Sequence, residues 1–314
     1  MSIGYITHPD CLLHDMGSRH PEQPARLSAI NDHLSAVGLD KVLQQHSATP
    51  VQKPQLLAAH DGAYLDSVFR QSPEHGRVAL DGDTAMNPFS LRAAQLAAGA
   101  AVQGVDMVMA GPINHVFCGV RPPGHHAEHD KAMGFCLFNN IAVAAFHALN
   151  QYGLERVAIV DFDVHHGNGT EHIVKGEERI LFCSSFQHPH YPHSGHDTEA
   201  ANISNLPLPA GCDGDAYRAA VSEHWLPRLA EFAPQLILIS AGFDGHQADP
   251  LADFNLVEDD FAWITRRLCE IADRSAQGRI VSSLEGGYDL DALARCVEAH
   301  LRTTKKTKET HSAT

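Results

Sequence analysis

Short apolar runs alternate along this chain with longer helical patterns, and this alternation constrains the fold more than any other feature. Strands are predicted at 115–118, 156–164, 179–184, 236–240 and 279–284. Amphipathic helices are predicted at 91–109, 138–149, 215–232, 257–272 and 290–301. Apolar strands that alternate with helices typically form a parallel sheet covered on both faces. We therefore predict an α/β fold with a central parallel sheet flanked by helices on both faces.

The domain organisation follows from composition. Apolar residues make up 44% and charged residues 19% of the 314 positions, which supports a sizeable core and excludes wholesale disorder. No linker rich in Pro, Gly or Ser divides the chain, so we expect a single domain over residues 1–302. Residues 303–314 have little to bury and are predicted to be a disordered tail.

Charge and cysteine content narrow the function. The chain has 23 Lys and Arg against 38 Asp and Glu, a formal net charge of −15. Phosphate contacts need clustered basic residues, which occur only at 305–308, so we expect no nucleic-acid partner and favour a cationic substrate. No membrane span or signal peptide is visible, which predicts a cytoplasmic protein. The seven cysteines form no C-x-x-C pair and are predicted to be reduced, mostly buried thiols.

Chemically capable residues follow four of the five predicted strands. These segments are 121–128, 161–169, 241–246 and 285–288, and each contains glycine, which lets the backbone approach a ligand closely. Ligands of parallel sheets bind beyond the carboxyl ends of the strands. The chain also has 23 histidines, as many as Lys and Arg together, which points to metal or proton chemistry.

The spacing after the second predicted strand indicates a metal site. On an extended strand alternate side chains share a face, so Asp161, Asp163 and His165 project together. Asp163 and His165 supply two ligands, and Asp244 from a neighbouring strand end supplies a third. Three protein ligands plus water is the arrangement of catalytic zinc, while this hard donor set also suits Fe(II), Co(II) or Mn(II). A lone Asp-x-His more often caps a helix, but a second Asp-bearing strand end favours the metal.

Two adjacent histidines, His125 and His126, add acid–base chemistry because imidazole titrates near working pH. Each needs an orienting partner: Asp161 is available to hold one, and Asn168 holds the other without adding charge. Tyr288, in a loop that two glycines are expected to make mobile, is a candidate donor to a developing oxyanion. A tyrosine after Gly-Gly more often only packs, so its role depends on the rest of the site.

Taken together, these segments resemble the zinc-dependent histone deacetylase and acetylpolyamine amidohydrolase superfamily, of arginase-like fold. The resemblance spans residues 4–301 and is greatest to the class II branch and its bacterial relatives. It rests on the segments 20–27, 121–127, 134–140, 161–170, 240–244 with 249–251, and 284–290. It implies zinc bound by Asp163, His165 and Asp244, and a structural potassium ion at Asp161, the main chain at 163 and 165, and Ser184.

The same resemblance implies a role for each catalytic residue. His126 is the general base and acid, and Asn168 is its partner, where class I enzymes have Asp. His125 is an electrostatic partner held by Asp161. Tyr288 matches the transition-state tyrosine, which implies a competent deacetylase because the weakly active class IIa branch has His at that position.

The resemblance also implies a substrate tunnel. Gly134, Phe135 and Tyr191 would line an acyl-lysine tunnel, and Arg26 a cavity below the metal. Tyr191 stands where Phe is common, and segment 192–195 differs from the usual Pro-Gly-Thr-Gly, so the rim is expected to select a different chain or acyl group. Segment 134–136 is closer to protein deacetylases than to the polyamine enzymes, which favours acyl-lysine.

We therefore expect a deacetylase that removes acetyl or other short acyl groups from the amine of lysine side chains. An acetylpolyamine deacetylase is the alternative. A manganese ureohydrolase of the arginase or agmatinase type is a rival, but it needs more bridging carboxylates where His165 and Asn168 stand. A non-catalytic acyl-lysine-binding module is another, against which the intact His125, His126 and Tyr288 argue. Assembly into a homo-oligomer is left open.

Overall fold

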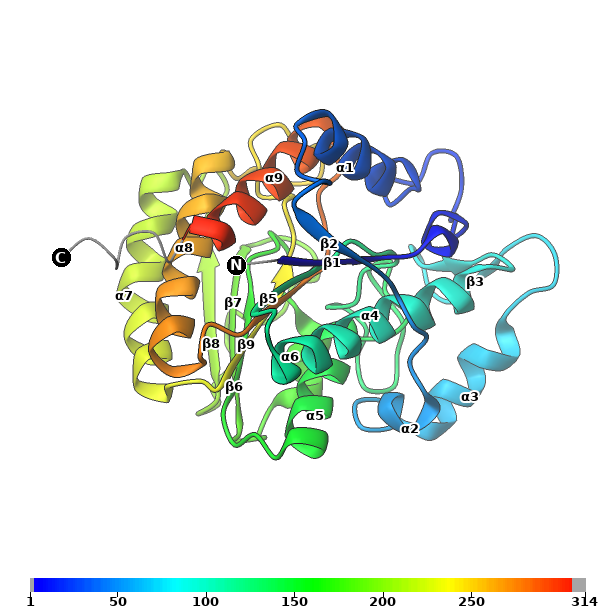
Figure 1. The fold of residues 1–314 in the computed structure, drawn as a ribbon. Helices are drawn as coiled ribbons and strands as arrows, with labels where there is room; N and C mark the ends of the chain where they lie inside the picture. Colours follow the sequence, from blue (N-terminus) through cyan, green and yellow to red (C-terminus); the bar gives the residue numbers. More distant parts are fainter. Residues whose placement is uncertain (1–2, 307–314) are drawn as a thin grey trace.

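Eight parallel strands form one sheet through the centre of the molecule (Figure 1). Their order is β2-β1-β5-β10-β9-β6-β7-β8, and the computed structural model describes residues 3–306. The strands are β1 (Ile3–Thr7), β2 (Leu43–Ser47), β5 (His115–Cys118), β6 (Val157–Asp161), β7 (Ile180–Gln187), β8 (Ile203–Leu208), β9 (Leu236–Ala241) and β10 (Ile280–Leu284). A separate antiparallel pair is formed by β3 (Val78–Ala79) and β4 (Ala85–Met86). The predicted parallel sheet is confirmed.

Helices cover both faces of the sheet, as predicted (Figure 1). On one face α4 (Ser90–Ala110) and α5 (Asn140–Tyr152) contribute to a large apolar cluster. The other face is covered by α1 (Ala25–Ala36), α7 (Gly214–Phe232), α8 (Glu258–Ser275) and α9 (Leu290–Lys306). Shorter helices are η1 (Pro9–Leu12), α2 (Lys53–Leu56), α3 (Gly62–Gln71) and α6 (Asn168–Val174).

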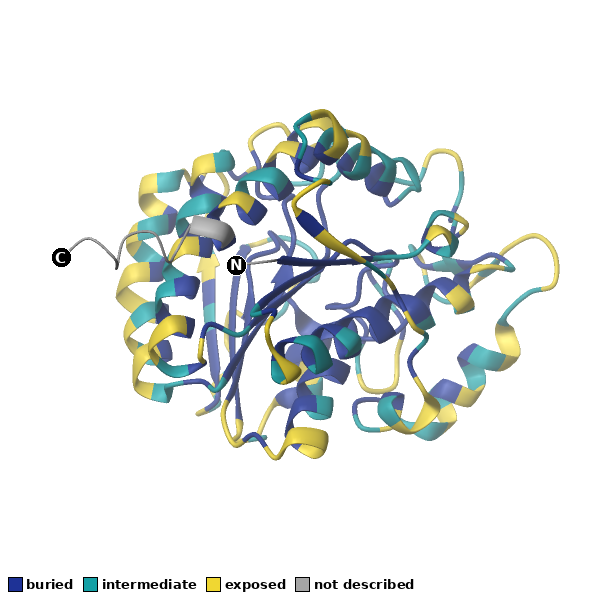
Figure 2. Ribbon diagram, in the orientation of Figure 1, coloured by how far each residue is buried: buried dark blue, intermediate teal, exposed yellow. Residues whose placement is uncertain are grey.

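Strand β6 shows why near-continuous apolar runs become central strands. Val157 and Ile159 belong to the apolar cluster on one face, whereas Ala158 and Val160 belong to the cluster on the other. Successive side chains point to opposite faces, so a strand covered on both sides has no polar positions to alternate with. Figure 2 shows the consequence, a buried sheet between helices whose outer surfaces are exposed.

Three strands of the sheet, β1, β2 and β8, were not predicted from the sequence pattern. Two of them, β2 and β8, are the edges of the sheet. In β2 only Leu43 is buried, so the strand lacks an apolar run. In β8 Pro207 interrupts the pattern, and proline is tolerated at an edge because one side of the strand needs no backbone donor. The two edge strands therefore lack the continuous apolar run by which a central strand is predicted.

The end of the chain differs from expectation. Helix α9 continues to Lys306, and Thr303 and Thr304 are buried, so the tail predicted from 303 does not begin there. The remaining tail residues, 307–314, lie outside the described residues. All seven cysteines are buried and free, which confirms the expected burial, while their reduced state stays a prediction. Within residues 3–306, no helix combines the length and the apolar composition that a bilayer crossing requires.

Candidate active site

Four neighbouring strands in the middle of the sheet carry the predicted site. Strands β5, β10, β9 and β6 are adjacent, and the chemically capable segments leave their carboxyl ends. The loop after β5 holds the two histidines, and the loops after β6, β9 and β10 hold the three candidate metal ligands and Tyr288. Because the strands are parallel, these four loops meet at one edge of the sheet. The topology thus brings together residues more than 160 positions apart in the sequence, such as Gly124 and Glu285.

The three predicted metal ligands converge. Ligand atoms of Asp163, His165 and Asp244 lie within 4.8 Å of one another, and all three residues are buried. His165 Nδ1 is 3.0 Å from Asp163 Oδ1 and 3.1 Å from Asp244 Oδ2. A Cβ at Gly286 would stand only 2.0 Å from Asp244 Oδ2, so this position must be glycine to leave room for the carboxylate. Two carboxylates directed at one imidazole nitrogen fit a divalent cation of the zinc type.

The electrostatics of this cluster also favour a cation. Burial alone would lower the pKa of His165, but its hydrogen bonds to the Asp163 and Asp244 carboxylates raise it to about 10. Burial raises the pKa of Asp244, and the negative charge of Asp163 raises it further. Two buried carboxylates that share one site repel each other unless positive charge lies between them. A divalent cation would provide that charge.

The strand that leads to the cluster ends earlier than predicted. Strand β6 stops at Asp161 instead of continuing to residue 164, and Asp163 and His165 belong to the loop that follows. The predicted alternation nevertheless persists, since Phe162 and Val164 pack into the apolar cluster on one face. Backbone hydrogen bonds fix this loop: the N–H of Val164 donates to Asp244 Oδ1 at 2.9 Å. The loop that carries two of the candidate ligands is thus held by the third, Asp244.

His125 and His126 lie side by side against the cluster, with ring centroids 4.0 Å apart. His125 Nδ1 is 2.9 Å from Asp161 Oδ2, and its Nε2 is 3.8 Å from Asp163 Oδ2. His126 Nδ1 is 2.8 Å from Asn168 Oδ1. The structure therefore pairs each histidine with the partner that the resemblance implies.

The two histidines differ in charge because their partners differ. Burial disfavours the charged form of His125, but the Asp161 and Asp163 carboxylates outweigh it and hold its pKa well above the ordinary value. Burial and the positive charge of His125 hold the pKa of His126 well below the ordinary value, against a weaker opposing effect of Asn168. The pair combines a charged imidazole with a neutral one, which suits one for electrostatic stabilisation and the other for proton removal.

Tyr288 lies in a loop that is held at several points, although its glycines predict mobility. Its backbone N–H donates to Asp249 Oδ2 at 2.7 Å. Arg26 Nε donates to the carbonyl of Gly287 at 2.6 Å, and the Arg26 guanidinium lies over the Tyr288 ring. Burial raises the pKa of Tyr288 well above its ordinary value, with Arg26 opposing, so the hydroxyl stays protonated. A protonated, positioned hydroxyl is a hydrogen-bond donor.

Aromatic rings border the histidine pair. Tyr191 meets His126 edge to face at 5.3 Å between centroids, and Phe135 meets Tyr288 in the same way at 6.0 Å. Phe135 has a φ of 70°, which is uncommon for a residue with a side chain. A Cβ at Gly134 would lie 2.4 Å from His126 Cδ2, so only glycine fits beneath that imidazole. These contacts are compatible with the predicted tunnel walls, whose role stays a prediction.

The predicted potassium site has less support. Asp161 and Ser184 are paired in the register of β6 and β7. Asp161 Oδ1 accepts from the backbone N–H of Asp163 at 3.1 Å, and the Ser184 hydroxyl accepts from the N–H of Gly167 at 3.4 Å. The oxygens lie in neighbouring strands, as the resemblance requires. The potassium ion itself stays a prediction.

Two acidic residues that support the site were not assigned from the sequence. Asp249 holds the Tyr288 backbone, and Glu285 Oε2 accepts from the backbone N–H groups of Gly124 and His125 at 2.6 and 3.1 Å. Burial raises the pKa of Glu285 to about 7. The sequence contained a signal for each of them. Glu285 directly follows a buried strand, and Asp249 directly precedes a proline, and neither segment carries a basic partner.

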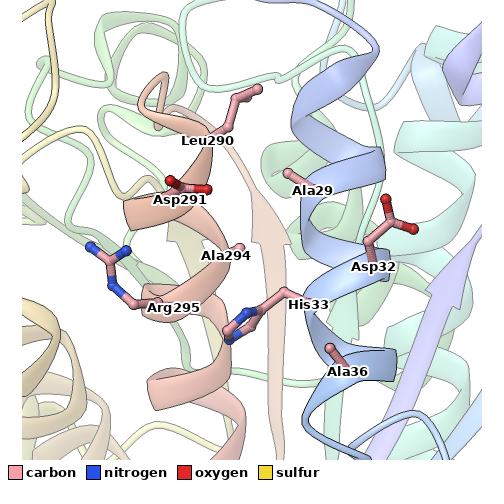
Figure 3. A pocket seen from close by; sticks show the side chains of 8 residues that line it. All are labelled: Ala29, Asp32, His33, Ala36, Leu290, Asp291, Ala294 and Arg295. Atoms are coloured by element: carbon pink, nitrogen blue, oxygen red, sulfur yellow. The ribbon is translucent and has the colours of Figure 1, made fainter.

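Two further features lie at the surface. Glu128, Asp130 and His172 also bring ligand atoms together, but Glu128 is only partly buried and the other two residues are exposed. Between α1 and α9 lies a hollow of about 480 Å³ (Figure 3). It is lined by Ala29, Asp32, His33, Ala36, Leu290, Asp291, Ala294 and Arg295. None of the predicted site residues lines this hollow.

Three candidate metal ligands, a histidine pair with distinct partners and a protonated tyrosine gather at the carboxyl edge of a parallel sheet. This arrangement is typical of a hydrolase. The family model of the histone deacetylase domain matches residues 20–304 of this chain. The chain therefore belongs to the histone deacetylase family.

The chain is also similar to individual proteins. An uncharacterized protein of Synechocystis is 42% identical over 310 residues, covering 96% of this chain and 98% of that protein. A histone deacetylase-like amidohydrolase of Pseudomonas aeruginosa is 39% identical over 276 residues, covering 86% of this chain and 72% of that protein. The crystal structure of the HDA15 HD domain superposes with a TM-score of 0.91 at 32% identity, covering 96% and 89% of the two chains. The predicted arginase-like fold is confirmed.

Proposed function

We propose that the protein is a zinc-dependent amidohydrolase that removes acetyl or other short acyl groups from the amine of lysine side chains. One observation carries the proposal: the ligand cluster of Asp163, His165 and Asp244 lies directly against the His125–His126 pair, with His125 Nε2 3.8 Å from Asp163 Oδ2. Membership of the histone deacetylase family supports amide hydrolysis, and this family is generally zinc-dependent.

Asp163, His165 and Asp244 would hold the zinc ion, whose contribution is Lewis acidity toward the acyl carbonyl and toward water. The protein supplies the proton transfers. His126 is oriented by Asn168 through Nδ1, so its Nε2 removes a proton from the attacking water and later delivers one to the leaving amine. Its low pKa keeps it unprotonated before the reaction.

Charge that develops on the acyl oxygen is stabilised by two further residues. The Tyr288 hydroxyl donates a hydrogen bond to this oxyanion, and the loop contacts from Asp249 and Arg26 hold it in place. His125, charged through its pairing with Asp161, contributes a fixed positive charge next to the cluster. These groups are preorganised, so little rearrangement is needed during the reaction.

The substrate proposal combines charge with the tunnel residues. A net charge of −15 favours approach of cationic lysine-bearing or polyamine substrates, so acetylated polyamines are the alternative to acyl-lysine. Phe135 and Tyr191 would contact the alkyl chain of the substrate. We further propose a structural potassium ion at Asp161 and Ser184. We also propose a cytoplasmic location and no nucleic-acid or membrane partner. A sedimentation measurement would decide whether the protein forms a homo-oligomer.

A side-by-side kinetic comparison tests the proposal. Zinc-loaded protein is assayed with acetyl-lysine peptides, longer acyl-lysine peptides and acetylated polyamines at matched concentrations. We expect the highest kcat/KM for one of the acyl-lysine peptides. A clear preference for acetylated polyamines would replace acyl-lysine by the alternative substrate.

Two further measurements test the rival functions, a ureohydrolase and a non-catalytic binding module. Release of urea from arginine or agmatine would support a manganese ureohydrolase, yet at the strand ends the described residues form one ligand group, with Asn168 next to His126. Binding of acyl-lysine without turnover would support a non-catalytic module. Retention of both histidines with their partners favours turnover.

A further inference from the structure

Asn168 connects His126 to an acidic side chain outside the metal cluster. Its amide oxygen Oδ1 is 2.8 Å from His126 Nδ1, and its amide nitrogen Nδ2 is 2.7 Å from Glu128 Oε1. Nδ2 also lies 3.3 Å from the sulfur of Met133. The order His126, Asn168, Glu128 forms a chain of hydrogen bonds that runs from the histidine pair toward the surface.

The chemistry of these groups sets the direction of every hydrogen bond in the chain. An ionised carboxylate only accepts, so the NH₂ group of Asn168 must face Glu128 and its carbonyl must face His126. A carbonyl also only accepts, so His126 must carry its proton on Nδ1. In a neutral imidazole the other nitrogen, Nε2, is then an acceptor and is free to take a proton.

Glu128 is itself held in place. Its backbone carbonyl accepts from His60 Nδ1 at 2.9 Å, and its backbone N–H donates to the carbonyl of Lys131 at 2.9 Å. Its Oε2 lies 3.5 Å from Nδ1 of His172, and its side chain is 27% exposed. The carboxylate therefore has a fixed backbone, one oxygen directed at Asn168 and the other directed at the surface.

We propose that Glu128 is a positioning residue that fixes the amide of Asn168 and thereby selects the Nδ1–H tautomer of His126. Its effect on catalysis rests on the proposed function, because only there does Nε2 of His126 act as a base. The same arrangement gives a reason for asparagine at 168. An aspartate there would place a second carboxylate at hydrogen-bond distance from Glu128, where the two negative charges repel.

Three substitutions separate this role from a general effect on the loop. Glu128→Leu removes the acceptor at similar size, so the Asn168 amide is free to rotate. Glu128→Gln keeps an acceptor oxygen. Asp130→Asn is the matched control, because Asp130 lies in the same loop and in the same exposed acidic group but is not a hydrogen-bond partner of Asn168 among the described residues. A cation held by Glu128, Asp130 and His172 would make the control behave like Glu128→Leu.

The first measurement is independent of turnover. Side-chain ¹⁵N NMR reports which nitrogen of His126 carries the proton, and the signal is assigned by its loss in His126→Gln. We expect the Nδ1–H tautomer in the wild type, Glu128→Gln and Asp130→Asn, and a mixture with the Nε2–H tautomer in Glu128→Leu. An unchanged tautomer in folded Glu128→Leu overturns the proposal, as does the same change in Asp130→Asn.

The second measurement is kinetic. Loss of an orienting partner typically costs 10- to 100-fold, so we expect Glu128→Leu to lower kcat by about that factor with KM within about twofold. Glu128→Gln should retain most of kcat. Asn168→Asp should also lower kcat, and adding Glu128→Gln to it should restore kcat at least about tenfold, because the glutamine amide donates to the new carboxylate. A double variant no better than Asn168→Asp overturns the proposal.

The two measurements also distinguish the inference from the proposed function. If the wild type hydrolyses none of the acyl substrates, the proposed function fails, while the tautomer of His126 still decides the role of Glu128. If the wild type is active and the tautomer is insensitive to Glu128→Leu, the inference alone fails. If Glu128→Leu does not fold, the comparison of Asn168→Asp with its double variant decides.

Discussion

The guanidinium of Arg26 lies over the ring of Tyr288, with its central carbon 4.8 Å from the ring centroid. Arg26 is fully buried, and it also donates to the carbonyl of Gly287, one residue before the tyrosine. The resemblance assigned Arg26 to a cavity below the metal. In the structure it supports the tyrosine through both the ring and the backbone, so the position of the hydroxyl depends on helix α1.

Removal of the Tyr288 hydroxyl should slow the reaction strongly. Tyr288→Phe keeps the ring and therefore its contacts with Arg26 and Phe135, but it removes one donor to the oxyanion. We expect kcat to fall by about 10²–10³, the loss typical of one such donor, with little change in KM. Tyr152→Phe, which removes an exposed hydroxyl bonded to Asp106, is the control. Wild-type turnover in Tyr288→Phe would show that the hydroxyl has no such role.

Metal binding should depend on the two carboxylates of the cluster. We expect the wild type to bind about one zinc ion per chain. Asp163→Ala removes the oxygen that lies 3.0 Å from His165 Nδ1, so we expect this variant to bind much less zinc. Elemental analysis after dialysis measures it. Asp106→Ala, a carboxylate bonded to His147 away from the site, serves as the control. Full zinc content in Asp163→Ala would contradict the ligand assignment.

Gly286 should tolerate no side chain. A Cβ there would stand 2.0 Å from Asp244 Oδ2 and 2.6 Å from Asp163 Oδ2, so Gly286→Ala must displace a ligand or the loop. We expect weaker zinc binding and a drop in kcat/KM of at least about tenfold, as for other disturbed ligand environments. Gly62→Ala, whose Cβ would make an ordinary 3.5 Å contact with Leu57, should leave both unchanged. Equal zinc affinity in the two variants would refute the steric argument.

Stability should fall in mild acid because of His60. Its Nδ1 donates to the carbonyl of Glu128 and its Nε2 accepts from the backbone N–H of Asn139, so the folded protein needs the neutral ring. Burial lowers the pKa of His60 from 6.5 to about 4, so between these values the unfolded chain binds the extra proton. The free energy of unfolding should therefore decrease as pH falls from about 6.5 to 4, by about 3 kcal/mol from this residue.

Urea unfolding at a series of pH values between 4 and 7 measures this contribution. His60→Gln, which keeps an acceptor and a donor but does not titrate, should show a shallower decrease over the same interval. The slope, rather than the absolute stability, is the relevant quantity, because the substitution itself destabilises the core. If the free energy of unfolding decreased with the same slope in both proteins, His60 would not contribute to the loss of stability in acid.

Much of the fold was predictable because its signals are local. Strand β6 is buried on both faces, so its apolar run is visible in the sequence, whereas the edge strands β2 and β8 lack such a run. The ligands Asp163 and His165 are two residues apart, so their convergence follows from the period of an extended chain. That period survives beyond the end of the strand because Phe162 and Val164, the residues that precede the two ligands, are buried.

The sequence by itself therefore determined the residue types, the local spacing of the ligands and the parallel sheet that gathers the loops. Only the tertiary structure decided which distant groups hold these residues: Arg26 at the Tyr288 loop, Asp249 at the Tyr288 backbone, Glu285 at the histidine loop and Glu128 at Asn168. The physical reason is that a hydrogen bond depends on position and direction in space. The strand order that brings these positions together leaves no periodic signal in the chain.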